Sequence, residues 1–259
     1  MTDIWASGQA YEPFVGRWSR LVAVEFLNWL ALPDQLRWLD AGCGTGALTS
    51  AILSQCEPTS ILGIDPSPDF IAWATANFQD YRARFETGDA TQLPHSVADV
   101  VVSGLVLNFI DEPYVALGAM QQSAPDGLVA AYVWDYAGRM ELIRHFWDAA
   151  IALDGSVSVL DEGRRFSICD RQSLTTLWKE ASYTEVTSRA IDVPTVFRDF
   201  DDYWNPFLGG QGPAPSYAMS LTDEHRNGLR DRIQAGLPIS SDGSIHLIAR
   251  AWAVQGRSA

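Results

Sequence analysis

The chain has 259 residues, of which 47% are apolar and 19% are charged, so it is long and apolar enough to bury a large core. Its 32 acidic residues outnumber its 18 basic residues and give a formal net charge of −14. This excess of negative charge disfavours electrostatic binding to nucleic acid or to an anionic membrane, and we expect neither as a partner.

Patterns for targeting and metal binding are missing from the sequence. Residues 1–10 have neither the basic nor the apolar region of a signal peptide, and the most apolar stretch, residues 21–32, is too short to cross a bilayer. The three cysteines are widely spaced and the four histidines lie far apart. We therefore predict a cytoplasmic protein without a disulfide framework and without a bound metal.

Short apolar segments alternate with longer amphipathic segments through the first half of the chain. This alternation predicts an α/β fold with a doubly wound sheet, in which helices join parallel strands. Ligands of such sheets bind at the carboxyl ends of the strands, so we expect the site there. The predicted strands are residues 37–40, 61–65, 84–87, 99–103 and 128–134, and the predicted helices are 47–55, 68–78 and 112–123.

The second half of the chain is less regular. Residues between the last two predicted strands, 195–239, are too many for a simple hairpin loop and include an aromatic stretch, 203–207, and a Gly/Pro segment, 209–215. We predict one domain over residues 1–259, with 195–239 inserted before the last strand as a small cap. The other predicted elements are helices at 140–153 and 171–181 and strands at 184–193 and 244–254.

A glycine-rich loop follows the first predicted strand, with the sequence Asp40-Ala41-Gly42-Cys43-Gly44-Thr45-Gly46. Glycines at a strand-to-helix turn let the backbone approach a ligand closely, because no Cβ atom intervenes. Gly42, Gly44 and Ala47 also satisfy the loose dinucleotide-binding pattern G-x-G-x-x-G/A. The loop alone does not distinguish one nucleotide cofactor from another.

Three carboxylates narrow the choice of cofactor. Asp40 lies directly before the loop, where a negative charge opposes a pyrophosphate but favours an ammonium or sulfonium group. Asp65 ends the second predicted strand, where a carboxylate accepts both hydroxyls of an adenosine ribose. Asp89, in Gly88-Asp89-Ala90 after the third strand, can accept the exocyclic amine of adenine, and Ala90 leaves room for the ring.

The run 40–46, together with Asp65 and residues 88–90, resembles the class I S-adenosylmethionine-dependent methyltransferases of the small-molecule type. The resemblance covers residues from about 10 to 135 and extends to the rest by topology. It implies a Rossmann-like seven-stranded sheet with an antiparallel last strand, S-adenosyl-L-methionine as cofactor and a small-molecule methyl acceptor. It also implies a set of cofactor-binding residues, namely Asp40, Gly42, Gly44, Gly46, Asp65, Pro66, Asp89, Ala90, Ser103 and Gly104.

An aromatic N-terminal segment completes the predicted cofactor site. In several relatives such a segment covers the cofactor, so we expect residues 1–30 to do so, with Tyr11 and Trp18 packed on the sulfonium cation. The alternative is that these aromatic side chains only pack the first helix on the sheet. For the acceptor, the candidate contacts are Leu105, Trp134, Tyr136, His145 and Trp204.

The catalytic residue, if one is needed, is not identified by the sequence. Many relatives have a histidine a few residues after the fourth strand, but this chain has Leu107-Asn108-Phe109 there. Two other functions stay open. An NAD-dependent oxidoreductase fits Asp65 but neither Asp40 nor residues 88–90, and the chain has no Tyr-x-x-x-Lys pair. A non-catalytic protein that only binds the cofactor is the second alternative.

Overall fold

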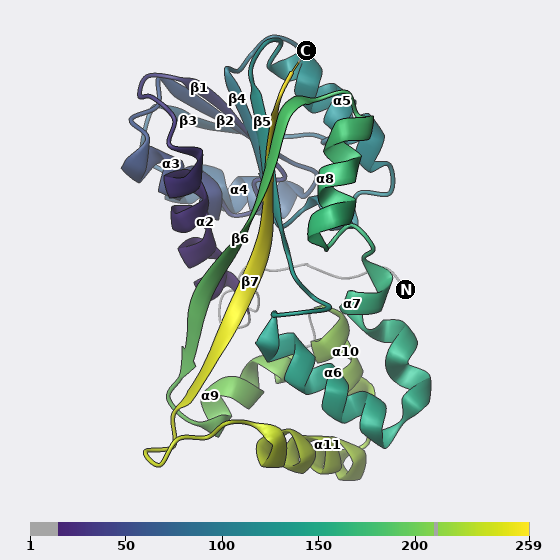
Figure 1. Ribbon diagram of the computed structural model, residues 1–259. Helices are drawn as coiled ribbons and strands as arrows, with labels where there is room; N and C mark the ends of the chain where they lie inside the picture. Colours follow the sequence, from purple (N-terminus) through teal and green to yellow (C-terminus); the bar gives the residue numbers. More distant parts are fainter. Residues whose placement is uncertain (1–14, 210–211, 259) are drawn as a thin grey trace. The chain divides into compact units, whose positions relative to one another are not determined.

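Seven strands form one sheet in the order β3-β2-β1-β4-β5-β7-β6 (Figure 1). The computed structural model describes residues 15–209 and 212–258, so Tyr11 and part of the Gly/Pro segment lie outside the described residues. Strands β1 to β5 pair in parallel, and β7 pairs with β5 in the antiparallel direction. These pairings confirm the predicted doubly wound, Rossmann-like sheet with an antiparallel last strand.

The chain divides into two compact units, and the single domain over 1–259 stays a prediction. The first, called here the sheet unit, comprises Ser19–Trp134, Ile168–Ile191 and Ala251–Ala259. It contains most of α2 (Arg17–Leu30), β1 (Arg37–Ala41), α3 (Ala47–Gln55), β2 (Ser60–Asp65), α4 (Pro68–Asn77), β3 (Ala83–Thr87), β4 (Val100–Gly104), η2 (Leu107–Phe109), α5 (Pro113–Ser123), β5 (Leu128–Trp134) and α8 (Arg171–Glu180).

The second, called here the helical unit, comprises Met1–Trp18, Asp135–Ser167 and Asp192–Arg250. Strands β6 (Thr184–Phe197) and β7 (Ile245–Arg257) contribute residues to both units. The other elements of the helical unit are α6 (Glu141–Leu153), η3 (Gly155–Leu160), α7 (Glu162–Arg165), α9 (Phe200–Trp204), η4 (Asn205–Gly209), α10 (Pro213–Ser220) and α11 (Asp223–Gly236).

The central strands of the sheet unit are apolar along their whole length. Every residue of β5 is buried, as are the first four of β4, which is the pattern of strands covered on both faces. Helices α2 and α3 lie on one side of the sheet, and α5 and α8 lie on the other (Figure 1). This arrangement leaves the carboxyl ends of β1 to β5, where loops begin, as the edge available to a ligand.

Strand β6 is longer than predicted and covers residues 195–197 of the predicted insertion. Val193, Thr195 and Phe197 are buried and the residues between them are exposed, so the alternation typical of a strand continues past residue 193. Pro194 lies within the strand. Because β6 lies at the edge of the sheet, a residue without a backbone N–H is tolerated there. The prediction of a strand ending at 193 was therefore wrong.

Aromatic side chains form the core of the helical unit. The rings of Phe146 on α6 and Phe207 on η4 stack with centroids 4.6 Å apart, and the Tyr203 hydroxyl on α9 donates to the Leu142 carbonyl at 2.8 Å. These contacts join α6 to the short helices between β6 and β7. The aromatic stretch that the sequence marks at 203–207 is thus part of a packed core.

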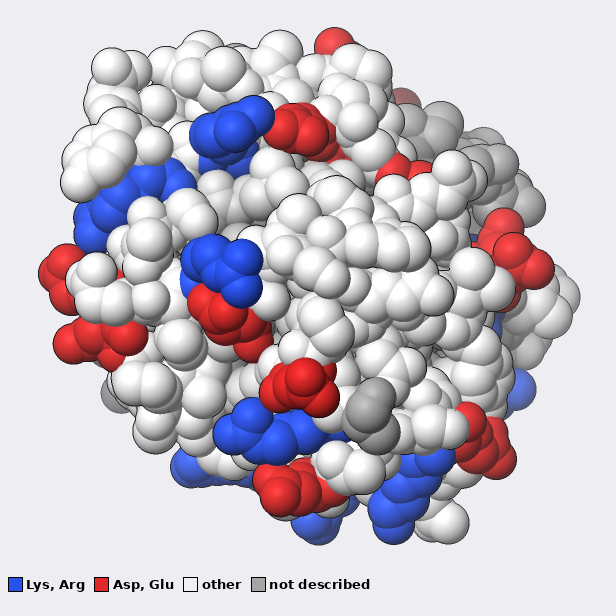
Figure 2. All heavy atoms as spheres, turned by 90° about the horizontal axis from the view of Figure 1, so that it is seen from above, with Lys and Arg blue, Asp and Glu red and all other residues white. Residues whose placement is uncertain are grey.

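Charged side chains on the surface are mixed in sign. On the face shown in Figure 2, basic and acidic side chains lie next to one another, with no broad patch of one sign. Ion pairs between such side chains include Arg37 with Asp99 and Arg82 with Asp80, at 2.6 and 2.7 Å. Among the described residues, no helix combines the length and the apolar character needed to cross a membrane.

Candidate functional site

The glycine loop between β1 and α3 is fixed by backbone hydrogen bonds to the end of β2. The amides of Gly42 and Cys43 both donate to the Ile64 carbonyl, at 2.7 and 3.1 Å, and the Gly46 amide donates back to the Cys43 carbonyl at 2.8 Å. Gly42, Gly44 and Gly46 have φ angles of +78°, +53° and +86°, in the left-handed region that favours glycine. The loop therefore has a defined shape that depends on its glycines.

The three glycines differ in what surrounds them. A Cβ atom on Gly42 would lie 2.6 Å from both methyl groups of Val106, and one on Gly46 would lie 2.6 Å from the Phe78 ring. A Cβ on Gly44 would have no atom within 4 Å. The absence of a side chain thus serves packing at Gly42 and Gly46, whereas at Gly44 it leaves open space above the loop.

Asp65, at the end of β2, holds the loop with its carboxylate. One oxygen accepts from the Gly44 amide at 2.9 Å, and the other accepts from the Ser67 amide at 2.9 Å. The residue is 8% exposed, and burial raises its pKa, although the two backbone hydrogen bonds oppose that shift. An ionised carboxylate accepts about four hydrogen bonds, so Asp65 keeps capacity for a pair of hydroxyl groups.

Asp40, near the end of β1, is 1% exposed and accepts a hydrogen bond from the Thr49 hydroxyl of α3 at 2.7 Å. Burial raises the pKa of Asp40 to about 7, the nearby Asp65 charge adds to this, and the Thr49 bond opposes it. Asp40 thus ties the first strand to the helix that follows the glycine loop. Direct contact of its carboxylate with a cofactor stays a prediction.

Asp89 lies two residues beyond β3 and is exposed. Its carboxylate accepts from the Thr91 amide and from the Thr91 hydroxyl, both at 2.7 Å, and these bonds lower its pKa. The Gly88 amide donates to the Asp65 carbonyl at 3.1 Å, which links this turn to the end of β2. Ala90 is buried and Pro66 is exposed. Asp89 is therefore negatively charged and close in the fold to Asp65.

The end of β4 lies beside the glycine loop. The buried Ser103 hydroxyl donates to the Ala41 carbonyl at 2.8 Å, so its proton is committed to the sheet. A Cβ on Gly104 would lie 2.6 Å from the Tyr132 hydroxyl. Leu105 has a φ of +64°, an uncommon conformation for a residue with a side chain, and its amide donates to the Tyr132 carbonyl at 2.8 Å.

The structure thus brings most of the predicted cofactor residues together at one edge of the sheet unit. Strands β3, β2, β1 and β4 are adjacent and parallel, so their carboxyl ends meet there. The residues that these strand ends and loops carry are Asp40, Gly42, Gly44, Gly46, Asp65, Pro66, Asp89, Ala90, Ser103, Gly104 and Leu105.

The remaining predicted residues are packed elsewhere. Trp134 ends β5 and is buried opposite Ala251 of β7. In the helical unit, the Trp18 ring meets Phe197 at 5.4 Å, and the Arg17 guanidinium covers it at 4.4 Å. Tyr136, His145 and Trp204 also belong to the helical unit, where Tyr136 and Trp204 are buried and His145 is half-buried. Their predicted roles in ligand binding stay predictions.

Sequence reasoning missed three residues that shape this edge. Val106 packs against Gly42, Phe78 packs against Gly46, and Thr49 binds the Asp40 carboxylate. Thr49 had a detectable signal, because it lies in the first turn of α3 and is buried with Leu48 and Ile52. The contacts of Val106 and Phe78 join segments distant in sequence, and no local pattern marks them.

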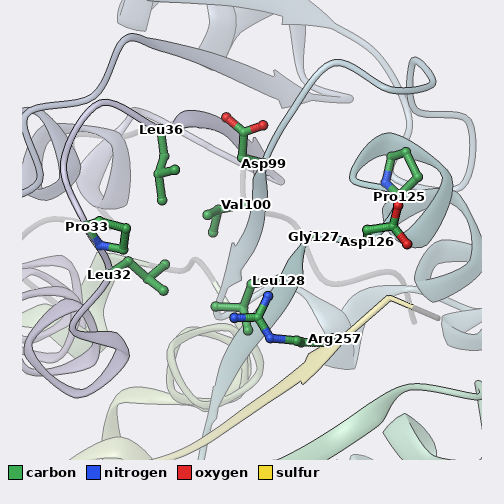
Figure 3. Close-up of a pocket in the computed structure, with 10 residues that line it drawn as sticks. All are labelled: Leu32, Pro33, Leu36, Asp99, Val100, Pro125, Asp126, Gly127, Leu128 and Arg257. Carbon is green, nitrogen blue, oxygen red and sulfur yellow. The ribbon is translucent and has the colours of Figure 1, made fainter.

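A pocket of about 300 Å³ lies at the opposite edge of the sheet unit (Figure 3). It is lined by residues where β4 and β5 begin, such as Val100 and Leu128, and by Arg257 at the end of the antiparallel β7. The Asp99 carboxylate at this pocket is held by the Arg37 guanidinium. Because the glycine loop follows the other end of the strands, this pocket is separate from the candidate site.

The residues at the carboxyl edge fit a positively charged adenosyl cofactor. Gly44 offers an open approach, Asp65 has unused acceptor capacity, and Asp89 adds a second carboxylate. A diphosphate at this edge would be repelled by the Asp40 and Asp65 carboxylates. The glycine loop carries no basic side chain that would offset this repulsion. Among the described residues, no group of three or more His, Cys, Asp or Glu side chains could hold a metal ion.

Comparison with known proteins gives the same assignment. Residues 39–131, which run from β1 to β5, match the family model described as the methyltransferase domain. An uncharacterized methyltransferase of Schizosaccharomyces pombe is 27% identical over 188 residues, which cover 69% of this chain and 70% of that protein. A trans-aconitate 2-methyltransferase of Deinococcus radiodurans is 32% identical over 96 residues, which cover 37% of this chain and 36% of that enzyme.

The fold is also that of a solved methyltransferase. A phosphoethanolamine N-methyltransferase of Haemonchus contortus, in complex with S-adenosyl-L-methionine, superimposes with a TM-score of 0.58 at 14% identity. The match covers 96% of this chain and 56% of that one. The glycine loop, the matched family model and this fold agree. Together they support a class I S-adenosylmethionine-dependent methyltransferase with S-adenosyl-L-methionine as its cofactor.

Proposed function

We propose that the protein transfers the methyl group of S-adenosylmethionine to a small-molecule acceptor by in-line displacement. The observation that carries this proposal is the Asp65 carboxylate, which the Gly44 and Ser67 amides fix at the end of β2. Its unused acceptor capacity matches the two hydroxyls of an adenosine ribose. Gly44, open on its outer side, would admit the rest of the cofactor next to it.

The sulfonium supplies a methyl group with a neutral leaving group, so the protein's task is alignment and exclusion of water. The residues of the site agree with that task. The glycine loop is held by backbone hydrogen bonds, and Val106 lies directly beside it. A general base is needed only for an acceptor whose nucleophile carries a tightly held proton.

A small organic acid is the first acceptor to test. Three relatives are named trans-aconitate 2-methyltransferase, at 29 to 32% identity over the matched regions. Their matches cover less than half of each enzyme, so the acceptor is a proposal drawn from these names. The net charge of −14 also favours a small molecule over a polyanionic nucleic acid.

Two measurements on the purified protein test the proposal. Calorimetric titration should show micromolar binding of S-adenosylhomocysteine and no binding of NAD. Methyl transfer from labelled S-adenosylmethionine is then measured with a panel of small organic acids that begins with trans-aconitate. Failure to bind S-adenosylhomocysteine would contradict the proposal. Tight binding without transfer to any acceptor would favour the non-catalytic alternative.

A further inference from the structure

The turn after β4 carries a polar group that nothing in the described fold satisfies. The side-chain Nδ2 of Asn108, in η2, is buried, and within the described residues it has no hydrogen-bond partner. An amide nitrogen of this kind supplies two N–H donors and accepts none. Because a buried donor without a partner is unfavourable, such an atom in a native protein needs an explanation.

The position of this turn points to a ligand. Leu105, three residues before Asn108, has the left-handed φ of +64° directly after β4. Strained backbone of this kind is concentrated at functional sites. Val106, the next residue, places both methyl groups against Gly42 of the glycine loop. The segment 105–109 is therefore anchored at the edge of the sheet where the cofactor site lies, and Asn108 belongs to it.

We propose that Asn108 contacts ligand in the methyl-transfer site, and that its side-chain amide donates a hydrogen bond to an oxygen atom of the bound molecule. The proposal rests on the proposed function. A carboxylate or carbonyl oxygen is the complement of an N–H donor. The amide is neutral, so it can donate a hydrogen bond to such an oxygen without introducing a positive charge beside the Asp40 and Asp65 carboxylates.

Two molecules can supply that oxygen, namely the amino-acid carboxylate of the cofactor and the methyl acceptor. With either source, Asn108 binds the ligand and transfers no proton, because a side-chain amide does not act as a base. The position where many relatives have a histidine is then used here for binding. An acceptor held by Asn108 would carry an oxygen near its nucleophilic atom.

The test uses the full chain and three variants. Asn108→Asp keeps the shape of the side chain but replaces the N–H donors with acceptors, and Asn108→Ala removes the group without adding charge. Asn77→Asp is the matched control, because Asn77 is exposed on α4 of the same unit and the change in charge is identical. Calorimetry with S-adenosylhomocysteine is compared with 5′-methylthioadenosine, which lacks the amino-acid part.

A cofactor contact predicts that Asn108→Asp weakens S-adenosylhomocysteine binding by about tenfold or more while 5′-methylthioadenosine binding stays within about twofold. An acceptor contact predicts unchanged binding of both nucleosides, with kcat/KM for trans-aconitate or another acid of the panel lowered by about tenfold or more. Asn108→Ala should follow Asn108→Asp in direction, and Asn77→Asp should match the wild type.

Equal behaviour of both Asn108 variants and the wild type in binding and in transfer would overturn the inference. Equal weakening of both nucleosides would overturn it too, because the variant would then disturb the whole edge. If the wild type transfers no methyl group to the panel, the acceptor contact is tested as binding of the panel acids to the S-adenosylhomocysteine complex, and unchanged affinity of both Asn108 variants for S-adenosylhomocysteine and for these acids overturns the inference. A wild type that fails to bind S-adenosylhomocysteine at all contradicts the proposed function instead.

Discussion

The carboxylate of Asp65 accepts a hydrogen bond from the backbone amide of Gly44 at 2.9 Å. This single bond joins the end of β2 to the glycine loop that follows β1. The same carboxylate also orders the turn into α4 through the Ser67 amide. Asp65 is therefore placed to hold the glycine loop and to bind a ribose. Substitutions of Asp65 distinguish these two roles.

Asp65→Ala should weaken S-adenosylhomocysteine binding by roughly 1–3 kcal/mol, or about 5- to 150-fold, because two ribose hydroxyls lose a charged acceptor. Asp65→Asn keeps one oxygen and should lose less. Asp69→Ala is the control, since Asp69 is an exposed residue of the first turn of α4. Calorimetry measures all three, and an Asp65→Ala protein that binds like the control would refute the ribose assignment.

Gly42 and Gly44 should respond differently to alanine. Gly42→Ala combines a φ of +78° with a Cβ that lies 2.6 Å from the Val106 methyl groups, so it should lower the melting temperature strongly. Gly44→Ala has no atom within 4 Å of the new Cβ, so we expect a melting temperature closer to the wild type but weaker S-adenosylhomocysteine binding.

The double variant Gly42→Ala/Val106→Ala tests whether the overlap of the new Cβ with the Val106 methyl groups causes the loss of stability. Removing the Val106 methyl groups relieves the overlap but leaves the backbone strain, so stability should recover in part. Thermal unfolding with and without S-adenosylhomocysteine measures both effects. A double variant no more stable than Gly42→Ala would show that Val106 is not the obstacle.

Ser103→Ala tests whether this hydroxyl serves the sheet or the cofactor. The hydroxyl donates to the buried Ala41 carbonyl at 2.8 Å, so its loss should lower the free energy of unfolding by about 1–2 kcal/mol. S-adenosylhomocysteine affinity should stay unchanged, because the proton is already used within the sheet. A marked loss of affinity with little loss of stability would instead support the cofactor contact that the family resemblance implies.

Glu162 gives the helical unit a pH-dependent stability. The residue is 3% exposed and accepts a hydrogen bond from the Trp147 indole, and burial raises its pKa from 4.5 to about 7. Between these values the unfolded chain has lost the proton and the folded chain still holds it, so stability falls as the pH rises from about 4.5 to about 7. The full effect is about 3 kcal/mol.

Glu162→Gln removes this titration and keeps an acceptor for Trp147. The variant should gain stability relative to the wild type as the pH rises from 5 to 8, measured by chemical denaturation at each pH. Glu224→Gln, on an exposed position of α11, is the control and should track the wild type. A wild type and a Glu162→Gln protein that differ by the same amount at every pH would contradict the raised pKa.

The sheet was predictable because its strands carry dense local signals. Helix 47–55 and strand 128–134 have the predicted bounds, β1, β2 and β3 differ by one residue at one end, and β4 is shifted by one residue. Strand β7 begins one residue later and ends three residues later than predicted. Strand β6 was predicted to end at Val193 and runs on to Phe197, through Pro194, which is tolerated because β6 lies at the edge of the sheet. Whether a strand lies at an edge depends on topology, which the local sequence does not contain.

Helices α7, α9 and α11 of the helical unit were missed, although their N-cap residues could be recognised in the sequence. Asp161 accepts from the Gly163 amide at the start of α7, Asp199 from the Asp202 amide at α9, and Thr222 from the His225 amide at α11. Helix α11 buries only Leu229 and Ile233, so its apolar periodicity is weak. Capping residues were the better signal there.

The site was predictable as far as its residues follow strand ends in sequence. The glycine loop, Asp65 and Asp89 were found this way, and the sheet order brings them together. The contacts of Val106 with Gly42 and of Thr49 with Asp40 depend on side-chain packing between elements, and the buried amide of Asn108 depends on the whole turn. No pattern of residue types in the chain encodes these.

A crystal structure of the protein with S-adenosylhomocysteine tests the central claim most directly. The account predicts that both ribose hydroxyls lie within hydrogen-bond distance of the Asp65 carboxylate, with the thioether chain passing over Gly44. A nucleoside bound elsewhere, or an Asp65 carboxylate that still contacts only Gly44 and Ser67 in the complex, would contradict it.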